Sequence, residues 1–339
     1  MSETTLPVGK LDARQLRRLL GAIECHDPSV VLGPGIGRDV AVIDNGAEGY
    51  LLAKTDPVTF ATDAIGYYVV NVNANDIATS GGSPRWFLAT ALLPENTATE
   101  AMIAEIFDQI TTACEDLGVT LVGGHTEITY GLDRPIVVGQ MLGEVSRDGL
   151  ITPEGLRVGD AIIVTKAVPL EGTALIAREK AGELASAGLA GDSLERCAQM
   201  LFDPGISVVA DARIAVATAG IHAMHDPTEG GLATGLWELA EAAGVGLRID
   251  ADAIPVLDEG LAICEHYGLD PLGLIASGSL LIGCAAADAE GITGALSEQG
   301  IRAAVIGHAT PADAGVQLLR DGVPGPMPRY DQDELTKIL

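Results

Sequence analysis

The chain contains two successive series in which short apolar runs alternate with stretches of helical periodicity, and this order constrains its fold more than any other feature. The first series predicts strands at 40–44, 50–56, 85–93, 119–124 and 136–145. Apolar residues at helical spacing predict helices at 12–25, 66–80 and 97–117.

A polar, glycine-rich segment at 146–160 separates the two series, and such a segment is typical of a domain boundary. The second series predicts strands at 161–168 and near 221–225, 245–250, 278–284 and 302–307. It predicts helices at 171–187, 192–201, 206–219, 229–243 and 257–267. The alternation predicts an α/β (α+β) chain with two domains, at 1–152 and 153–339.

An excess of acidic residues narrows the possible functions. The 339 residues include 20 Lys and Arg against 47 Asp and Glu, which gives a formal net charge of −27. Because nucleic-acid backbones are bound chiefly by basic residues, we expect no nucleic-acid partner. An anionic substrate would need local cations at its site, and metal ions are a simple source of them.

The cysteines and the apolar runs indicate the compartment. The five cysteines are widely spaced and include no C-x-x-C pair, so the sequence predicts neither a zinc site nor a disulfide framework. The first residues lack the layout of a signal peptide, and no run of about 18 apolar residues occurs. We therefore expect a soluble, cytoplasmic protein that does not bind a membrane.

Several common nucleotide and hydrolase motifs are absent from the sequence. There is no G-x-x-x-x-G-K-[ST], and Gly33-Pro-Gly35-Ile-Gly37 lacks the third glycine of a dinucleotide fingerprint and precedes a strand. G-x-S-x-G and H-E-x-x-H are also missing. These absences argue against a P-loop enzyme, a Rossmann dehydrogenase, a serine hydrolase and a zinc protease.

Acidic and polar residues instead follow apolar runs or glycine turns, where catalytic groups often lie. Taken singly, an Asp at a turn is most often an Asx turn or a helix cap. Several converging carboxylates would need a cation, and oxygen ligands suit Mg²⁺ or Ca²⁺. The candidates are Asp39, Asp56, Asn75, Asp76, His125, Glu127 and Asp226.

Two glycine-containing segments, GGHTE at 123–127 and HDPTEGG at 225–231, carry the stronger signals. Their glycines allow backbone N–H groups to approach a ligand, and the second segment precedes an apolar helix whose N-terminus suits a phosphate. His222 and His225 form a possible metal pair, but packing or hydrogen bonding is the simpler reading because no thiolate or third histidine is near.

Five blocks taken in order resemble the AIR synthase (PurM-like) superfamily over about residues 30–310. The blocks are GPGIGRDVAVI, KTDPVTF, VNANDIATSGGSPRWFLATALLP, LVGGHTE and HDPTEGGL. Within the superfamily, TDPVTF and DPTEGGL are most similar to the hydrogenase-maturation (HypE) branch and its AIR-synthase-related paralogues. The resemblance implies a homodimer in which the N-terminal α/β domains form a β-barrel, each with a C-terminal α/β domain beside it.

The resemblance also implies an ATP cleft and assigns roles to the motif residues. Asp39, Asp56, Asp76 and Asp226 would hold Mg²⁺ on the triphosphate. Substrate contact or proton transfer would fall to His125, Glu127, His225 and Glu229. Residues assigned to nucleotide binding are Gly35, Gly37, Asn75, Gly123, Gly124, Thr228, Gly230 and Gly231.

The expected function is ATP- and Mg²⁺-dependent phosphorylation, with or without dehydration, of an amide, carboxylate or similar oxygen of a small molecule or partner protein. HypE chains end in Pro-Arg-Ile-Cys, whereas Pro328-Arg329-Tyr330 continues here to Leu339 with no cysteine after Cys284, which argues against a role in hydrogenase maturation. The alternatives are a kinase of the thiamine-monophosphate-kinase type and an ATP-binding maturation or scaffold subunit. In the latter, the segment after Pro328 is either a docking element or a disordered terminus.

Overall fold

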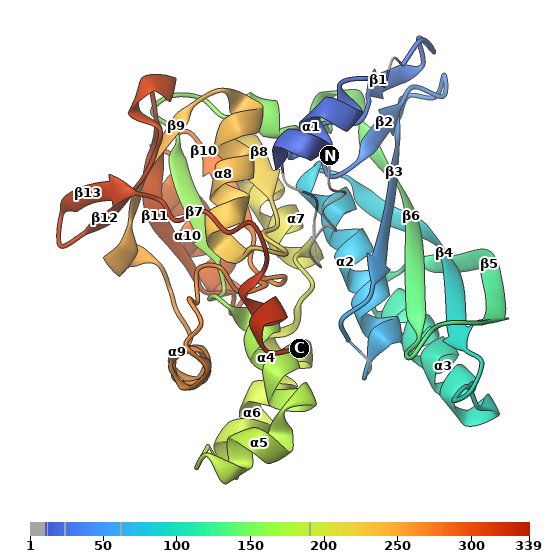
Figure 1. The fold of residues 1–339 in the computed structure, drawn as a ribbon. Helices are drawn as coiled ribbons and strands as arrows, with labels where there is room; N and C mark the ends of the chain where they lie inside the picture. Colours follow the sequence, from blue (N-terminus) through green and yellow to red (C-terminus); the bar gives the residue numbers. More distant parts are fainter. Residues whose placement is uncertain (1–10, 12, 24, 62, 190) are drawn as a thin grey trace, which may run out of the picture.

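The computed structural model describes residues 11, 13–23, 25–61, 63–189 and 191–339, so parts of the predicted helix at 12–25 lie outside the described residues. The chain forms two β-sheets that lie side by side, and helices pack on each sheet (Figure 1). The strands up to residue 146 form a six-stranded N-terminal sheet, and those from residue 161 form a seven-stranded C-terminal sheet. The prediction of an α/β (α+β) fold is confirmed.

The N-terminal sheet has the strand order β1-β2-β3-β6-β4-β5, with every neighbouring pair antiparallel except β4 and β5. Helix α3 (Glu100–Leu117) makes the crossover that this parallel pair requires. Helices α2 (Ile65–Thr79) and α3 form one apolar core with the sheet. The strands are β1 (Val30–Leu32), β2 (Ala41–Ile43), β3 (Gly49–Val58), β4 (Ser83–Pro94), β5 (Thr120–Thr129) and β6 (Ile136–Ser146).

The C-terminal sheet has the order β13-β12-β9-β11-β7-β10-β8. Helix α8 (Gly231–Ala243) covers one face, and α7 (Val209–Thr218) and α10 (Ala289–Glu298) cover the other. Because side chains alternate along a strand, Ile162 packs with the α8 cluster and Ile163 with the α7–α10 cluster. The strands are β7 (Ala161–Thr165), β8 (Ile221–His225), β9 (Gly246–Asp250), β10 (Leu281–Cys284), β11 (Ala303–Thr310), β12 (Val316–Arg320) and β13 (Val323–Pro326).

Helix α2 joins the two halves of the molecule, because it packs on the N-terminal sheet and also against α7 and β8 (Figure 1). The Asn75 side chain donates from Nδ2 to the Ile206 carbonyl at 2.9 Å and accepts at Oδ1 from the Val208 N–H at 2.8 Å. Asn75 is fully buried, so these bonds fix α2 against the segment that leads into α7.

The structure differs from the sequence prediction at several elements. The predicted helix at 171–187 is two helices, α4 (Leu170–Glu179) and α5 (Ala181–Ser186), with a break at Lys180. The prediction missed β1, α10, β12 and β13; α10 contains two glycines, and the three strands have only three to five residues each. The remaining helices are α1 (Ala13–Leu20), α6 (Asp192–Gln199) and α9 (Asp258–Tyr267).

The segment after Pro328 is ordered and packs against the C-terminal domain. Leu335 is fully buried, and the Glu334 carboxylate accepts a hydrogen bond from the Asp270 N–H at 2.9 Å. Asp333 Oδ2 accepts from the Gly230 N–H at 2.7 Å. The alternative of a disordered terminus is therefore wrong. Among the described residues, no helix has the length and apolar character needed to cross a membrane.

Candidate active site

A cleft of about 680 Å³ lies between the two halves of the molecule and receives side chains from both. The N-terminal half contributes the loop before β2, the strand β3 and the helix α2, and the C-terminal half contributes the segment that follows β8. Sequence-predicted residues that line it are Gly35, Gly37, Asp39, Asp56, Asp76, His225, Asp226, Thr228 and Glu229.

Lys54 holds two of the predicted carboxylates together. It precedes Asp56 by two positions on β3, so both side chains lie on one face of the strand. Its Nζ lies 3.2 Å from Asp56 Oδ2 and 3.3 Å from Asp76 Oδ2. Burial alone would lower the pKa of Lys54, but attraction to these carboxylates outweighs it and raises the pKa well above its usual range.

Asp226 is a buried carboxylate without a hydrogen-bond partner at either oxygen. It directly follows β8, and its side chain lies in the cleft. Burial is the main cause that raises its pKa to about 7, and repulsion from Asp39 adds to the shift. Ligand atoms of Asp39, His225 and Asp226 lie within 4.8 Å of one another. Since unpartnered buried carboxylates are costly, this arrangement suits a bound cation.

His225 lies between two carboxylates. Its Nδ1 is 3.0 Å from Asp39 Oδ2, and its Nε2 is 2.9 Å from Glu238 Oε2 on α8. Burial would lower its pKa, but these two partners raise the pKa well above its usual value, which favours the imidazolium form. His222 instead pairs with Asp160 at 2.8 Å. The two histidines have different partners, as expected for hydrogen bonding rather than a metal pair.

The glycines of the predicted site fall into two groups. Gly35 and Gly37 line the cleft, and Gly37 has a φ of +70° and lies so close to α8 that a Cβ would meet the Glu238 carbonyl at 3.1 Å. Gly230 donates its N–H to Asp333, so the chain itself caps this position at the start of α8. Gly231 packs so closely that a Cβ would meet the Leu272 carbonyl at 2.5 Å.

Asn75 does not line the cleft, although its neighbour Asp76 does. The Asn75 amide is bonded to Ile206 and Val208, as described above, and therefore serves the contact between the two halves. In this chain its observed role is structural.

The GGHTE residues lie on the edge strand β5, away from the cleft. β5 is three strands from β3, which corresponds to ~14 Å at the usual strand spacing. His125 Nε2 contacts Glu127 Oε2 at 3.2 Å, and both side chains are more than half exposed. Gly123 follows a bulge at Val122, and a Cβ on Gly124 would lie 1.9 Å from the Ala89 carbonyl oxygen. Close packing against β4 therefore explains why a glycine occupies position 124. Within a single chain, the GGHTE residues do not reach the cleft.

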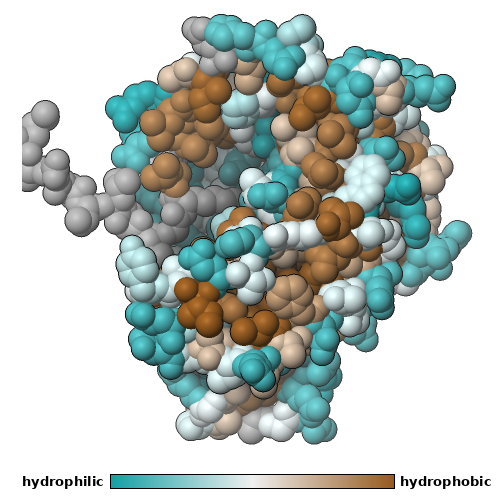
Figure 2. Space-filling model, turned by 90° about the vertical axis from the view of Figure 1, so that its right-hand side faces the viewer, coloured by the Kyte–Doolittle hydropathy of each residue, from teal (hydrophilic) through white to brown (hydrophobic). Residues whose placement is uncertain are grey.

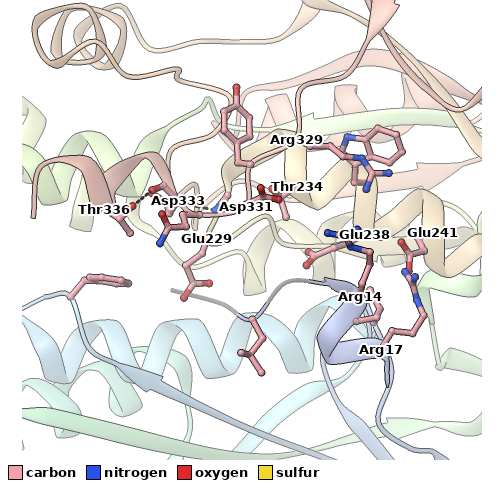
Figure 3. Close-up of a pocket in the computed structure, with 17 residues that line it drawn as sticks. Arg14, Arg17, Glu229, Thr234, Glu238, Glu241, Arg329, Asp331, Asp333 and Thr336 are labelled. Carbon is pink, nitrogen blue, oxygen red and sulfur yellow. Dashed lines mark hydrogen bonds and ion pairs between the residues drawn. The ribbon is translucent and has the colours of Figure 1, made fainter. Parts of the chain in front are cut away.

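A second chamber of about 550 Å³, the outer chamber, adjoins the cleft and shares Ile36, Phe60, Glu229 and Glu238 with it. Glu229, Asp333 and Thr336 lie at one end and Arg14, Arg17 and Glu241 at the other (Figure 3). The Arg329 guanidinium lies 3.7 Å from the centre of the Trp237 ring. The C-terminal segment thus forms a wall of the site.

Sequence reasoning missed Lys54, Glu238, Glu171 and Tyr68, which all line the cleft. Lys54 carried a signal, because it alternates with Asp56 on a predicted strand. Glu238 is one of two acids in the mostly apolar helix α8, and the sequence did not show that it, rather than Glu241, contacts His225. Glu171 and Tyr68 gave no local signal, because their positions depend on how α2 and α4 pack.

Comparison with known proteins gives a consistent result. The N-terminal domain of AIR synthase related proteins matches residues 37–145, and their C-terminal domain matches residues 157–318. The chain is 31% identical to the carbamoyl dehydratase HypE of Cupriavidus necator over 77% of this chain and 72% of that protein.

Solved structures share the fold. The crystal structure of HypE from E. coli aligns with a TM-score of 0.75 at 23% identity and covers 96% of this chain and 99% of that one. A crystal structure of the hydrogenase maturation protein HypE in complex with ATP aligns with a TM-score of 0.71 at 22% identity, over 95% and 93% of the two chains. The chain therefore belongs to the AIR synthase related (PurM-like) family, with HypE proteins among its relatives.

Proposed function

We propose that this protein is an ATP- and Mg²⁺-dependent enzyme that transfers a phosphoryl group to an oxygen of an acceptor substrate in the cleft. The observation that carries the proposal is Asp226, a buried carboxylate with two unpartnered oxygens facing Asp39. The relative solved with ATP supports the nucleotide. Asp39, Asp56, Asp76 and Asp226 are the proposed metal ligands.

The donor set fits a magnesium ion. Four carboxylates offer only oxygen ligands, which Mg²⁺ prefers, and it commonly shares its shell with substrate phosphates. The bound metal would neutralise phosphate charge during transfer. Both ring nitrogens of His225 already contact carboxylates, Nδ1 that of Asp39 and Nε2 that of Glu238, so we assign His225 to charge balance beside Asp39 and Asp226 rather than to metal ligation.

Lys54 and Glu229 have roles that follow from their positions. Lys54 is a partly buried cation between Asp56 and Asp76, so it orients both carboxylates and opposes the burial that raises the pKa of Asp76. Glu229 lies where the cleft meets the outer chamber, and we place the acceptor substrate there. The acceptor is an amide, a carboxylate or a similar oxygen nucleophile, because phosphorylation turns such an oxygen into a good leaving group.

We further propose that two copies associate through the N-terminal sheet. The strand β5 is an unpaired edge among the described strands, and Val122, Ile128 and Tyr130 on or beside it are exposed. Apolar residues gather in the middle of the molecular face on the side of this sheet (Figure 2). Such a face is rarely left open to water. His125 and Glu127 would then lie at the interface between subunits, where a partner could complete their environment.

The test is calorimetric titration with a nonhydrolysable ATP analogue, with and without Mg²⁺, together with light scattering for the mass in solution. Metal-dependent binding to a dimer supports the proposal, and absence of binding under both conditions contradicts it. Product analysis with ATP and candidate acceptors then separates a kinase from a dehydrating enzyme, because only the latter releases free phosphate.

A further inference from the structure

A recess in the wall of the cleft contains two buried polar groups that lack partners. Glu171, at the start of α4, is 5% exposed, and its Oε2 has no hydrogen-bond partner. The Tyr68 hydroxyl, from α2, is also buried and unpartnered. Both residues line the cleft together with Ser277, which hydrogen bonds to the Glu171 carboxyl. We call this place the Glu171 recess.

The charges around the Glu171 recess are negative. Burial is the main cause that raises the pKa of Glu171 to about 8, and repulsion from Glu229 and Asp333 adds to it. Burial of Asp333 itself is the main cause that raises its pKa to about 6, and repulsion from Glu229 adds to the shift. Burial and then Glu171 raise the pKa of Tyr68. At neutral pH the Glu171 carboxyl is therefore mostly protonated and lies beside other acidic groups.

The nearby cations are directed at other carboxylates. Arg178, on the same helix as Glu171, pairs through Nη2 with Asp63, while its Nε has no partner. Lys54 lies between Asp56 and Asp76. A nine-tenths buried carboxyl with one unpartnered oxygen and further carboxylates around it favours a ligand that brings both a hydrogen-bond donor and a positive charge.

We propose that the Glu171 recess binds a primary ammonium group of the acceptor substrate. The ammonium would donate one hydrogen bond to Glu171 Oε2 and a second to the Tyr68 hydroxyl oxygen, while the carboxyl proton leaves to the solvent. This inference rests on the proposed function for the reaction that the substrate undergoes, but the binding of the ammonium group is independent of ATP.

A neutral amide is the competing ligand, because a protonated carboxyl can pair with an amide without losing its proton. The two ligands differ in proton release and in their response to the surrounding carboxylates. Glu229 and Asp333 favour a cation by electrostatic attraction and give no such advantage to an amide. The number of protons released on binding therefore separates the two classes.

The experiment is calorimetric titration of the full-length protein with ethanolamine and, separately, with acetamide. Titrations at pH 7.0 in PIPES and HEPES, which differ in ionisation enthalpy, give the protons released. We expect ethanolamine to bind with release of close to one proton per site and acetamide to bind at least tenfold more weakly. Equal binding of the two probes, or ethanolamine binding without proton release, would overturn the proposal.

Variants test the residues. Glu171→Gln removes the charge at constant size and is expected to weaken ethanolamine binding at least tenfold, whereas Glu290→Gln on the exposed side of α10 is expected to change nothing. Tyr68→Phe removes only the hydroxyl and should weaken binding severalfold, so it decides the question if Glu171→Gln does not fold. Unchanged ethanolamine binding in folded Glu171→Gln, or in Tyr68→Phe, would contradict the proposal that the Glu171 recess binds the ammonium group.

The same samples are titrated with the Mg²⁺–ATP analogue. Ethanolamine binding without nucleotide binding would contradict the proposed function and leave the Glu171 recess supported. Nucleotide binding without ethanolamine binding would support the proposed function and contradict ammonium binding in the Glu171 recess.

Discussion

Asp39 Oδ2 lies 3.0 Å from His225 Nδ1, so an ion pair joins the loop before β2 to the last residue of β8 in the other sheet. The next residue, Asp226, has no such partner. Asp39 and Asp56 raise its pKa by repulsion, while His225 and Lys54 lower it by attraction, and burial dominates both effects. The two halves of the molecule thus meet at an acidic cluster that is only partly neutralised.

Replacing Asp226 with Asn should separate metal binding from folding. The amide removes one proposed ligand charge, so we expect the Mg²⁺-dependent affinity for an ATP analogue to fall roughly tenfold or more. The metal-free protein should be at least as stable as wild type, because a costly buried carboxylate is gone. Titration calorimetry and thermal melting in EDTA measure the two effects. Asp313→Asn, at an exposed position, is the control. Wild-type Mg²⁺ dependence in Asp226→Asn would refute the assignment of Asp226 as a metal ligand.

The pKa of Asp226 predicts how stability depends on pH. Its pKa is about 7 in the folded protein and near 3.9 in the unfolded chain, so the folded state binds more protons between these values. The stability of the metal-free protein should therefore fall as pH rises from 4 to 7, by at most about 4 kcal/mol from this residue. Urea unfolding in EDTA at pH 5 and pH 8 tests this for wild type and Asp226→Asn. Parallel pH profiles for the two proteins would contradict the shift.

Much of the fold was predictable because local periodicity reports which side of an element faces a core. Strands β2, β3, β4 and β6 and helices α2 and α3 lie within a few residues of their predicted bounds. The elements that were missed are short or glycine-rich, so their own residues carry little periodic signal. The predicted domain boundary after residue 152 stays a prediction.

The candidate site was predictable where an acid follows a strand or lies beside a glycine turn, as for Asp39, Asp56 and Asp226. The sequence could not show that the Asn75 amide is bonded across the domain contact, because that depends on where α7 packs. It also could not show that Asp333, more than a hundred residues away, caps Gly230. Such contacts arise from tertiary packing.

Lys54→Met should destabilise the metal-free protein at pH 8. Without the ammonium group, Asp76 is left as a buried carboxylate beside Asp56, which costs roughly 3 kcal/mol when one partner of a buried pair is removed. Added Mg²⁺ should restore part of the lost stability, since it supplies positive charge to the same oxygens. Arg85→Met, which breaks an exposed pair with Glu144, should cost no more than about 1 kcal/mol. Equal losses for the two variants, measured by urea unfolding, would argue against this role.

Asn75→Ala should weaken the contact between the two halves. It leaves the Ile206 carbonyl and the Val208 N–H without their partner, at a cost of roughly 2–4 kcal/mol. Asn71→Ala on the same helix is the matched control, because Asn71 donates to Tyr67 within α2. We expect it to cost about 1 kcal/mol. Urea unfolding measures both variants, and a smaller loss for Asn75→Ala than for Asn71→Ala would contradict the role of this contact.

Asp333→Ala should detach the C-terminal segment from the start of α8. The carboxylate accepts the Gly230 N–H and the Leu335 N–H, each at 2.7 Å, so its removal leaves two backbone donors unpaired and should cost roughly 1–3 kcal/mol. Asp331→Ala removes an exposed carboxylate from the same segment and should stay within about 0.5 kcal/mol of wild type. Hydrogen exchange at Gly230 and Leu335 locates the effect, because both amides should lose protection in Asp333→Ala alone. If their protection were unchanged, Asp333 would not be the residue that anchors the segment against the wall of the outer chamber.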